Sequence, residues 1–387
     1  MKLYFSDQAL PNTVTKSIFL AGPSPRSADV YDWRHDALKY LEQIGFDGEV
    51  LIPIPFKKFY GESDDPSWTY IGQITWEENA RELADKILFW VARDIAGHMP
   101  GFTTNVEYGL DLKGGKIVYG RPNEADKIRY LDDLYQKLKK IPFADLNAML
   151  DDTVASLGEG ALRTEGEVHV PLLIWNTEQF QSWYGNLKQA GNKLIHAKLL
   201  QHLSIPNFGV FSYVLAVNVW IEQEKRFKSN EVIYSRKDIS SVIAYYPSNE
   251  GNYVAFIKEF RSPVNNSEGL VYELPSGSSA KNIAPEVNAQ HELFEETGLF
   301  VKDIERFNYV TTKQLVATLS THQAHTYKIK LEKEEFDFLV NQQDTNAKMG
   351  NAKENEATYV CMIKDKDLAK YPIDYANIGM IFTALYT

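Results

Sequence analysis

Residues 277–299 read GSSAKNIAPEVNAQHELFEETGL and place three glutamates, Glu292, Glu295 and Glu296, near the end of the stretch. Side chains three and four residues apart share one face of a helix, so a helix here crowds the three carboxylates into one patch. Like charges at this spacing repel one another and stabilise a plain helix surface poorly. A hard divalent cation such as Mg²⁺ takes oxygen ligands and relieves that repulsion. The stretch therefore predicts a helix that stops at Gly298, with a cation site on its last turn.

The simplest alternative is a solvated acidic helix end. That alternative does not require the particular order of elements that surrounds the three glutamates. A strand-like run at 270–274 is followed by a glycine, a loop, a helix and the carboxylates. This order resembles the Nudix box of hydrolases that cleave nucleoside diphosphates linked to another group. The positions in register are Gly277, Glu292, Leu293, Glu295, Glu296, Gly298 and Leu299. The resemblance implies an α/β/α sandwich with a mixed sheet, in which Glu292, Glu295 and Glu296 bind Mg²⁺ or Mn²⁺ and Glu295 also assists catalysis.

Two positions depart from the Nudix pattern. Ile283 stands where the family has its first glutamate, although Glu286 follows about one turn later, and His291 stands where the family has an arginine. In the family that arginine forms an ion pair that orients the glutamates, so the resemblance implies metal binding more firmly than rapid turnover. These departures motivate an alternative function, a nucleotide-sensing or regulatory protein that binds its ligand with little turnover.

The rest of the C-terminal half reads mainly as strands and turns. Apolar and alternating runs predict strands at 211–222, 232–235, 240–246, 252–260 and 359–364, and a closing helix at 377–385. The polar stretch 341–356 lacks periodicity and reads as a loop. Some Nudix relatives carry the catalytic base in such a loop, so the resemblance makes Glu354 or Glu356 the candidate base.

Two further segments, 259–264 and 272–277, resemble the ADP-ribose pyrophosphatase branch of the Nudix family. By this resemblance Arg261 and Glu273 hold the substrate, Arg261 on a phosphate or on the terminal ribose. Arginine binds phosphate oxygens in a bidentate manner, which suits the assignment chemically. The simpler reading of Arg261 is a charge at a strand edge.

The first third of the chain alternates buried strands with amphipathic helices. Strands are expected at 17–21, 50–53, 86–91 and 116–119. Alternation over this length predicts a doubly wound, flavodoxin- or Rossmann-like parallel sheet. Ligands bind beyond the carboxyl ends of the strands in such sheets, and Gly22 and Pro23 directly follow the first predicted strand. This turn is a candidate ligand loop, in which Arg26 is either a phosphate ligand or a plain loop charge.

Three short motifs, IFLAGP, ADKILFWV and TTNVEYG, resemble the nucleoside 2-deoxyribosyltransferase superfamily, which includes nucleotide N-glycoside hydrolases. The resemblance implies that Glu107 is the nucleophile that attacks the anomeric carbon of the sugar. It also implies that Glu77, which precedes the expected helix cap Asp85, protonates the departing base. Asp94 and Asn105 take substrate-binding positions on the same grounds. The plain alternatives are that Glu107 merely favours a helix start and that Glu77 is solvated helix surface.

Composition sets outer limits on the class of protein. The chain has 387 residues, too many for one typical domain, and 44% of them are apolar, enough for sizeable cores. We expect domains at 1–125 and 206–387, joined by a helical extension at 126–205 that includes a helix over 186–203. The net charge of −11 argues against nucleic acid or an anionic membrane as a partner. The single cysteine, Cys361, excludes an internal disulfide and a cysteine-based zinc site.

Together these features predict a bifunctional nucleotide-processing hydrolase. The C-terminal domain is expected to hydrolyse a nucleoside diphosphate derivative such as ADP-ribose with Mg²⁺, and the N-terminal domain to cleave or transfer an N-glycosidic bond. A Nudix hydrolase with a non-catalytic N-terminal domain is a further alternative. Relatives of both modules assemble with themselves, so the resemblance implies a homo-oligomer that binds small nucleotide substrates. The absence of a signal pattern and of any apolar run near about 20 residues leads us to expect a cytoplasmic protein.

Overall fold

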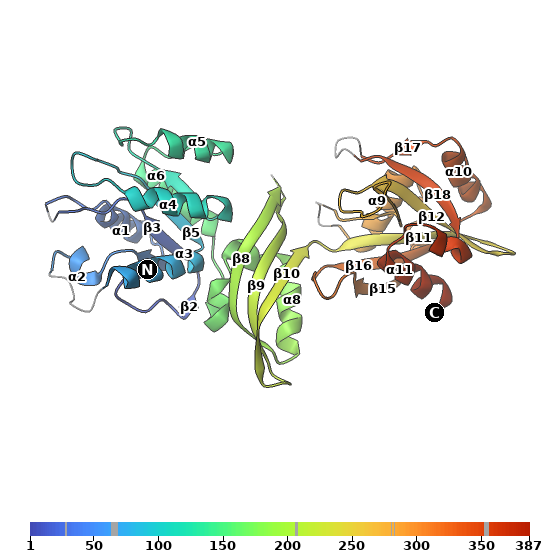
Figure 1. Ribbon diagram of the computed structural model, residues 1–387, viewed down its shortest axis with the longest axis horizontal. Coiled ribbons are helices and arrows are strands. Elements are labelled where there is room, and N and C mark those ends of the chain that lie inside the picture. The colour runs from blue at the N-terminus through green and yellow to red at the C-terminus, as the bar shows by residue number, and fades with distance from the viewer. Residues whose placement is uncertain (28, 63–68, 206–207, 280, 282, 352–355) are drawn as a thin grey trace. The chain divides into compact units, whose positions relative to one another are not determined.

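The computed structural model describes residues 1–27, 29–62, 69–205, 208–279, 281, 283–351 and 356–387 (Figure 1). The chain divides into two compact units, Met1–Ile233 and Tyr234–Thr387. The domain limits expected near residues 125 and 205 both fall inside the first unit. Within the described ranges, no helix is long and apolar enough to cross a membrane.

The described part of the first unit is built on a five-stranded parallel sheet with the order β1-β4-β3-β5-β6. The strands are β1 (Lys2–Phe5), β4 (Glu49–Ile52), β3 (Ser17–Ala21), β5 (Lys86–Trp90) and β6 (Ile117–Gly120). Every residue of β3, β4 and β6 is buried, because helices cover both faces of the sheet. The prediction of an α/β fold with a parallel sheet is confirmed, whereas β1 has no counterpart among the predicted strands.

Helices of the first unit pack on the two faces of this sheet (Figure 1). One face carries α1 (Arg34–Gln43) and α6 (Leu146–Leu157). The other face carries α3 (Tyr70–Leu83), α4 (Phe102–Asp111) and α5 (Arg129–Lys137). A short helix, α2 (Phe56–Phe59), follows β4. Alternate residues of β3 point to opposite faces, since Leu20 packs in the core under α1 and Phe19 in the core under α3.

The strand order places a topological switch point at the carboxyl ends of β3 and β5. From β3 the chain passes through α1 to β4 on one side, and from β5 it passes through α4 to β6 on the other. Ligands bind at such a switch point in open parallel sheets. Gly22 follows β3 with a φ of 149°, and a Cβ there would lie 2.3 Å from the Trp90 carbonyl oxygen. Only glycine therefore lets the ends of these two strands approach so closely.

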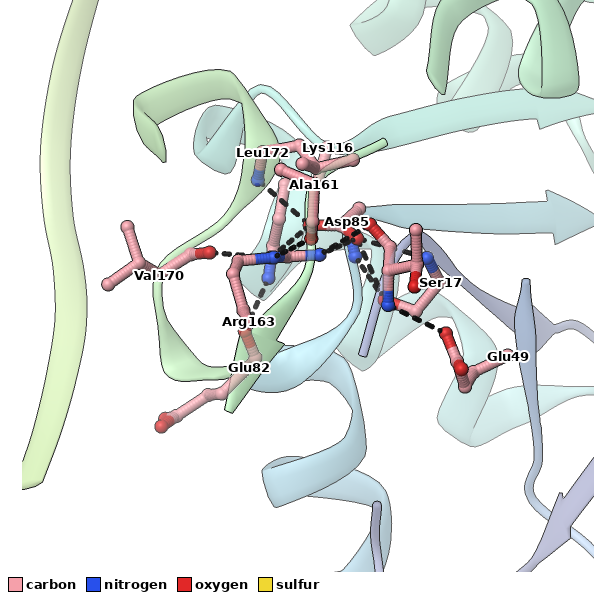
Figure 2. Close-up of polar contacts among 10 residues, drawn as sticks. Ser17, Glu49, Glu82, Asp85, Lys116, Ala161, Arg163, Val170 and Leu172 are labelled. Carbon is pink, nitrogen blue, oxygen red and sulfur yellow. Dashed lines mark hydrogen bonds and ion pairs between the residues drawn. The ribbon is translucent and has the colours of Figure 1, made fainter. Parts of the chain in front are cut away.

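A buried ion pair holds the opposite, amino edge of the same sheet (Figure 2). Asp85, directly before β5, accepts hydrogen bonds from both terminal nitrogens of Arg163, at 2.8 and 2.6 Å. The same carboxylate accepts hydrogen bonds from the backbone N–H of Ser17, at the start of β3, and of Leu172, at the start of α7 (Leu172–Trp175). The prediction that Asp85 caps a helix is wrong, because its carboxylate joins β3, α7 and Arg163 rather than the end of α3.

A smaller three-stranded sheet follows the parallel sheet along the chain, in the order β10-β9-β8. Its strands are β8 (Lys193–Ile205), β9 (Gly209–Ile221) and β10 (Arg226–Arg236). Helices α7 and α8 (Glu178–Gln189) pack against it through an apolar core that includes Phe180 and Leu215. The helix predicted over 186–203 is wrong, because α8 ends at Gln189 and β8 begins at Lys193. Two short strands, β2 (Thr13–Val14) and β7 (Arg163–Thr164), pair separately.

The described part of the second unit contains an eight-stranded mixed sheet. Its main path is β15-β16-β11-β12-β18-β17, while β13 pairs with β12 and β14 with β11. Only the pairing of β11 with β16 is parallel among the pairings of these described strands. The strands are β11 (Ile239–Ser248), β12 (Gly251–Phe260), β13 (Leu270–Glu273), β14 (Ser276–Gly277), β15 (Asn308–Gln314), β16 (Gln323–Lys330), β17 (Lys348–Met349) and β18 (Thr358–Lys364).

Helices cover two faces of this mixed sheet as well. One face carries α9 (Pro285–Thr297) and α10 (Lys333–Asp344), and the other carries α11 (Tyr375–Tyr386). The predicted strands and the closing helix are confirmed, and α9 ends at Gly298 with a φ of 75°, as predicted. The stretch 341–356 is only partly a loop, because its first residues belong to α10 and residues 348–349 form β17.

Candidate functional sites

Helices α3 and α4 bring Glu77 and Glu107 together in the first unit. Both helices pack on the same face of the parallel sheet, with Glu77 in the middle of α3 and Glu107 in the second turn of α4. The two carboxyl groups are hydrogen-bonded to each other, and both residues are half-buried. The structure therefore joins two carboxylates that the sequence singled out separately.

Burial raises the pKa of both carboxyls. The pKa of Glu77 rises to about 7 through burial and the charge of Glu107, although a hydrogen bond from Gln73 opposes this rise. Burial also raises the pKa of Glu107, while the guanidinium of Arg81 and the hydrogen bond from Glu77 oppose it. Two carboxyls in direct contact do not both ionise readily. The hydrogen bond from Glu77 and the guanidinium of Arg81 both favour the ionised form of Glu107.

Two further residues of α3 belong to this polar cluster, and the sequence analysis missed both. Gln73 Nε2 donates to Glu77 Oε1 at 2.5 Å and to the Pro53 carbonyl oxygen at 2.8 Å. Arg81 Nη1 pairs with Asp111 Oδ2 of α4 at 2.7 Å. A usable signal existed in the sequence: both residues stand four positions from Glu77, so all three share one helix face.

The predicted ligand turn at Gly22 and Pro23 is fixed by α1. Arg34, which is fully buried, donates from Nη2 to the Gly22 carbonyl oxygen at 2.9 Å. Its Nη1 lies 3.4 Å from the Pro23 carbonyl oxygen, which also accepts from Trp33 Nε1 at 3.1 Å. These hydrogen bonds therefore fix the backbone of the turn at the carboxyl end of β3.

The other three residues predicted for the first site have partners outside the carboxyl pair. Arg26 is exposed, and its guanidinium carbon lies 5.8 Å from the centre of the Phe102 ring. Asp94 is exposed and accepts a hydrogen bond from a backbone N–H in its own loop, at 2.7 Å. Asn105 Oδ1 accepts from Arg93 Nη2 at 2.5 Å.

In the second unit, α9 and the segment before β18 bring three carboxylates close together. Glu296 is only 3% exposed and accepts a hydrogen bond from the Ser276 N–H at 2.9 Å. Burial and the charge of Glu292 raise its pKa well above the ordinary value, and Glu356 acts in the same direction. Thr358 Oγ1 donates to the Glu296 carbonyl oxygen at 2.9 Å, which holds this segment against the end of α9.

Gly277 provides the space in which the carboxyl group of Glu292 lies. A Cβ at Gly277 would lie 2.5 Å from Glu292 Oε2, closer than any normal contact. Asn288 Nδ2 donates to the Gly277 carbonyl oxygen at 2.8 Å and so ties the loop to α9. The glycine therefore sets the position of a carboxylate, in addition to ending the strand before it.

The predicted substrate residues Arg261 and Glu273 are neighbours. Arg261 Nε lies 3.1 Å from Glu273 Oε2, and Arg261 Nη2 lies 3.0 Å from Glu259 Oε2. The sequence analysis missed Glu259, which is 7% exposed and whose pKa burial raises against the nearby Arg261. Side chains along a strand alternate between the two faces of the sheet. Ala255 lies on the face of β12 that α9 covers, so Glu259, four residues later, is expected on the same face.

A second guanidinium, Arg236, lies at the same site and was also missed. Arg236 Nη2 donates to Ser278 Oγ at 3.1 Å, directly after Gly277. Burial lowers the pKa of Arg236, and the charge of Arg261 acts in the same direction. The two guanidiniums are therefore near neighbours. No periodic pattern in the sequence marks Arg236, the last residue of β10, because polar residues surround it in the sequence.

The remaining predicted positions lie around this cluster. Glu295 is exposed, and its carbonyl oxygen accepts a hydrogen bond from the Gly350 N–H at 3.1 Å. His291 is exposed as well. Glu286, the possible substitute for the family's first glutamate, accepts from the Tyr327 hydroxyl at 3.4 Å. Glu354 lies outside the described residues, which leaves Glu356 as the described candidate base.

The carboxylates of the second unit fit a hard cation in chemistry. Among the residues that the structure describes, no group of three or more His, Cys, Asp or Glu side chains is arranged to hold a metal ion. Glu292 and Glu296 are nevertheless close enough to repel each other, and oxygen ligands of this kind suit Mg²⁺ or Mn²⁺. Of the three predicted ligands, these two form the neighbouring pair, whereas Glu295 is exposed on the same helical turn.

Each unit thus contains its own cluster of carboxylates with at least one raised pKa. A scan against models of known protein families finds no match, and a search of curated proteins finds none either.

Proposed function

We propose that the second unit hydrolyses the diphosphate of a nucleoside diphosphate derivative, such as ADP-ribose, in a reaction that depends on Mg²⁺ or Mn²⁺. The resemblance of residues 277–299 to the Nudix box supports this proposal, as does a mixed sheet with helices on two faces. The observation that carries it is the buried Glu296 beside Glu292, because a cation relieves the repulsion between these carboxylates.

Each side chain of the cluster has a definite task in such a reaction. Glu292 and Glu296 would hold the ion, which supplies positive charge that polarises a phosphoryl oxygen and acidifies a water molecule. Arg261, positioned by two carboxylates, binds a phosphate oxygen of the substrate through its guanidinium. Arg236 adds a second positive charge beside the loop after Gly277. Glu356 accepts the proton of the attacking water, and the products are a nucleoside monophosphate and a sugar phosphate.

The test is the release of nucleoside monophosphate from a panel of nucleoside diphosphate sugars by the purified chain with Mg²⁺. Glu296→Gln is expected to reduce this release by about 100-fold, the upper end of the range for disturbing a metal site. Glu107→Gln, which alters the other unit, is expected to retain it. Absence of release by the wild-type chain from every compound would reject the proposal, and tight binding without hydrolysis would support the sensing alternative.

We propose N-glycosidic bond cleavage or transfer as a second activity, in the first unit, on the strength of the hydrogen-bonded pair of Glu77 and Glu107. Glu107 attacks the anomeric carbon as the bond to the base breaks, and Glu77 gives its proton to the departing base. The product of this step is a glycosyl ester on Glu107. Water or a second base then attacks the same carbon, Glu77 takes up its proton, and the carboxylate of Glu107 leaves.

Intact-mass measurement with a slowly reacting fluorinated nucleoside analogue tests this second activity. The wild-type chain is expected to gain the mass of the glycosyl group, and Glu107→Gln is expected to gain nothing. Glu78→Gln, at an exposed neighbour of Glu77 on α3, serves as the matched control and is expected to react like the wild type. An adduct that persists in Glu107→Gln would exclude this residue as the nucleophile.

A homo-oligomer is also part of the proposal, since relatives of both modules assemble with themselves. Light scattering coupled to size-exclusion chromatography gives the mass in solution directly. A mass equal to one chain over the working range of concentrations would reject the homo-oligomer. It would not affect the two proposed activities.

A further inference from the structure

Helix α3 carries a polar stripe at intervals of four residues, made of Gln73, Glu77 and Arg81. Side chains at this spacing lie one above the other on a single helix face. Gln73 is 8% exposed and Arg81 is 7% exposed, although both carry groups that are usually solvated. Burial of two such side chains on either side of a titratable pair calls for a structural or chemical reason.

The stripe faces a second polar pair on α4. Glu107 and Asp111 are also four residues apart, and Arg81 Nη1 lies 2.7 Å from Asp111 Oδ2. Glu77 and Glu107 are hydrogen-bonded across the two helices, one turn away from this ion pair. Two other charged groups act on Glu107: Arg34 of α1 lowers its pKa less strongly than Arg81 does, and Asp111 raises its pKa.

Gln73 is oriented by a group that leaves it no freedom. The Pro53 carbonyl oxygen can only accept, so the amide nitrogen of Gln73, and not its oxygen, faces Pro53 at 2.8 Å. The second hydrogen of the same nitrogen then points to Glu77 Oε1 at 2.5 Å. The carbonyl oxygen of a protonated carboxyl accepts a hydrogen bond more readily than its hydroxyl oxygen does, so this contact favours Oε1 as the carbonyl oxygen. The preferred place for the proton of Glu77 is then Oε2.

We propose that Gln73 and Arg81 are positioning residues of this carboxyl pair. Gln73 fixes which oxygen of Glu77 bears the proton, and Arg81 keeps Glu107 as the carboxylate. The inference rests on the proposed glycosidic activity, because that reaction needs an acid and a nucleophile with these separate roles. Neither side chain touches the reacting atoms.

The test is a pH titration of the carboxyl groups themselves, by ¹³C NMR of the full chain labelled at glutamate Cδ. Glu77→Gln and Glu107→Gln assign the two resonances. In Arg81→Met the titration of the pair is expected to move upward by about one pH unit, because a positive neighbour is lost. Arg81→Lys keeps the charge and is expected to restore most of the wild-type behaviour. Gln73→Met, of similar volume but without a donor, is expected to move the titration of Glu77 upward.

Glu78→Gln, one residue along α3 and exposed, is the matched control and is expected to leave both titrations unchanged. Thermal unfolding of each variant shows whether it is folded, and Gln73→Met decides the question if Arg81→Met does not fold. Titrations in Gln73→Met and Arg81→Met that coincide with those of the wild type would overturn the inference.

Adduct formation with the nucleoside analogue separates this inference from the activity on which it rests. If the titrations move as expected while the wild-type chain forms no adduct, the positioning roles stand and the glycosidic activity fails. If both variants form the adduct at the wild-type rate and pH optimum, the activity stands and the positioning roles fail.

Discussion

Glu296 is a residue at which folding stability and the proposed activity oppose each other. Its carboxyl is almost fully buried, and burial together with Glu292 raises its pKa well above the ordinary glutamate value. The folded chain therefore keeps a proton at a pH where the unfolded chain has already released it. As pH rises above the ordinary glutamate pKa, the free energy of unfolding falls, because the unfolded state binds fewer protons.

Replacement of Glu296 by glutamine is accordingly expected to stabilise the chain in the absence of divalent cations. At about pH 8 the free energy of unfolding should rise by on the order of 1 kcal/mol, and the gain should shrink toward about pH 5. Mg²⁺ should raise the unfolding temperature of the wild type more than that of the variant, since a ligand that binds only the folded state stabilises it.

Denaturant unfolding with and without EDTA measures both effects. Glu305→Gln, at an exposed glutamate of the same unit, is the control and is expected to change neither. A Glu296→Gln variant that is less stable than the wild type at about pH 8 without metal would contradict the assignment of Glu296 as a repelled, buried carboxyl.

Single residues differ in how far the sequence reveals their role. Glu107, Glu292 and Glu296 stand in recognisable motifs, and the structure places each of them in a carboxylate cluster. The sequence analysis missed Gln73 and Arg236, because what distinguishes them is their hydrogen bonds to distant parts of the chain. Gln73 is oriented by a carbonyl after β4, and Arg236 by a serine after β14. The contacts of a polar residue outside any motif become known only from the folded structure.

Strand β8 shows why one secondary-structure element was predicted wrongly. Its sequence, KLIHAKLLQHLSI, spaces apolar residues three and four apart, which is typical of a helix. In the sheet, register shifts between β8 and β9 follow Leu194, Leu199 and Leu203. Each shift changes which face the following residues occupy, so the regular alternation of a strand disappears from the sequence. Pairing with β9 outweighed the local helical pattern.

The loop between β14 and α9 gives a prediction at the scale of elements. Gly277→Ala places a methyl group against the carboxyl of Glu292, which is a flexible side-chain end, so Glu292 should move rather than the backbone. The stability should change by less than about 1 kcal/mol, while the affinity for Mg²⁺ or Mn²⁺ should fall by about 10-fold. Isothermal titration with either ion, together with thermal unfolding, measures the two effects.

A second glycine offers the matched control for this loop. Gly379 lies within α11, and a Cβ there meets nothing within 4 Å. Gly379→Ala should raise the free energy of unfolding by about 0.5–1 kcal/mol, because alanine favours a helix, and should leave metal affinity unchanged. Equal metal affinity in Gly277→Ala and the wild type would show that Gly277 does not position Glu292.

Across the whole molecule, the sequence predicted the main strands better than it predicted the long-range contacts that hold them together. Continuous apolar runs predicted β3, β5 and β6, because a strand buried on both faces has no polar side. The partner of Asp85 was beyond prediction, since Arg163 lies 78 residues away and no local pattern joins them. The division into two units, after Ile233, also lies later than the boundary expected at residue 206 from the change to a strand pattern.

The ion pair of Asp85 and Arg163 is expected to stabilise the first unit as a whole. Asp85→Asn leaves a buried guanidinium without its counter-charge and should lower the free energy of unfolding by about 3–5 kcal/mol. The double variant Asp85→Leu with Arg163→Met should lose less, because no buried charge remains. Calorimetry measures the losses, and only the transition of the first unit should move.

Asp133→Asn is the control for this measurement, because Asp133 pairs with Lys137 on the exposed face of α5. It is expected to leave the transition unchanged. An Asp85→Asn variant as stable as the wild type would show that the buried network is dispensable.

The hydrogen-bonded network around Asp85 also affects which parts of the sequence can diverge during evolution. It lies at the amino ends of β3 and β5, whereas Gly22 lies at the carboxyl end of β3, against the end of β5. Sequence changes in the turns beyond the carboxyl ends therefore leave the Asp85 network intact. Substitutions at the carboxyl ends can therefore accumulate without first weakening the network that joins the amino ends.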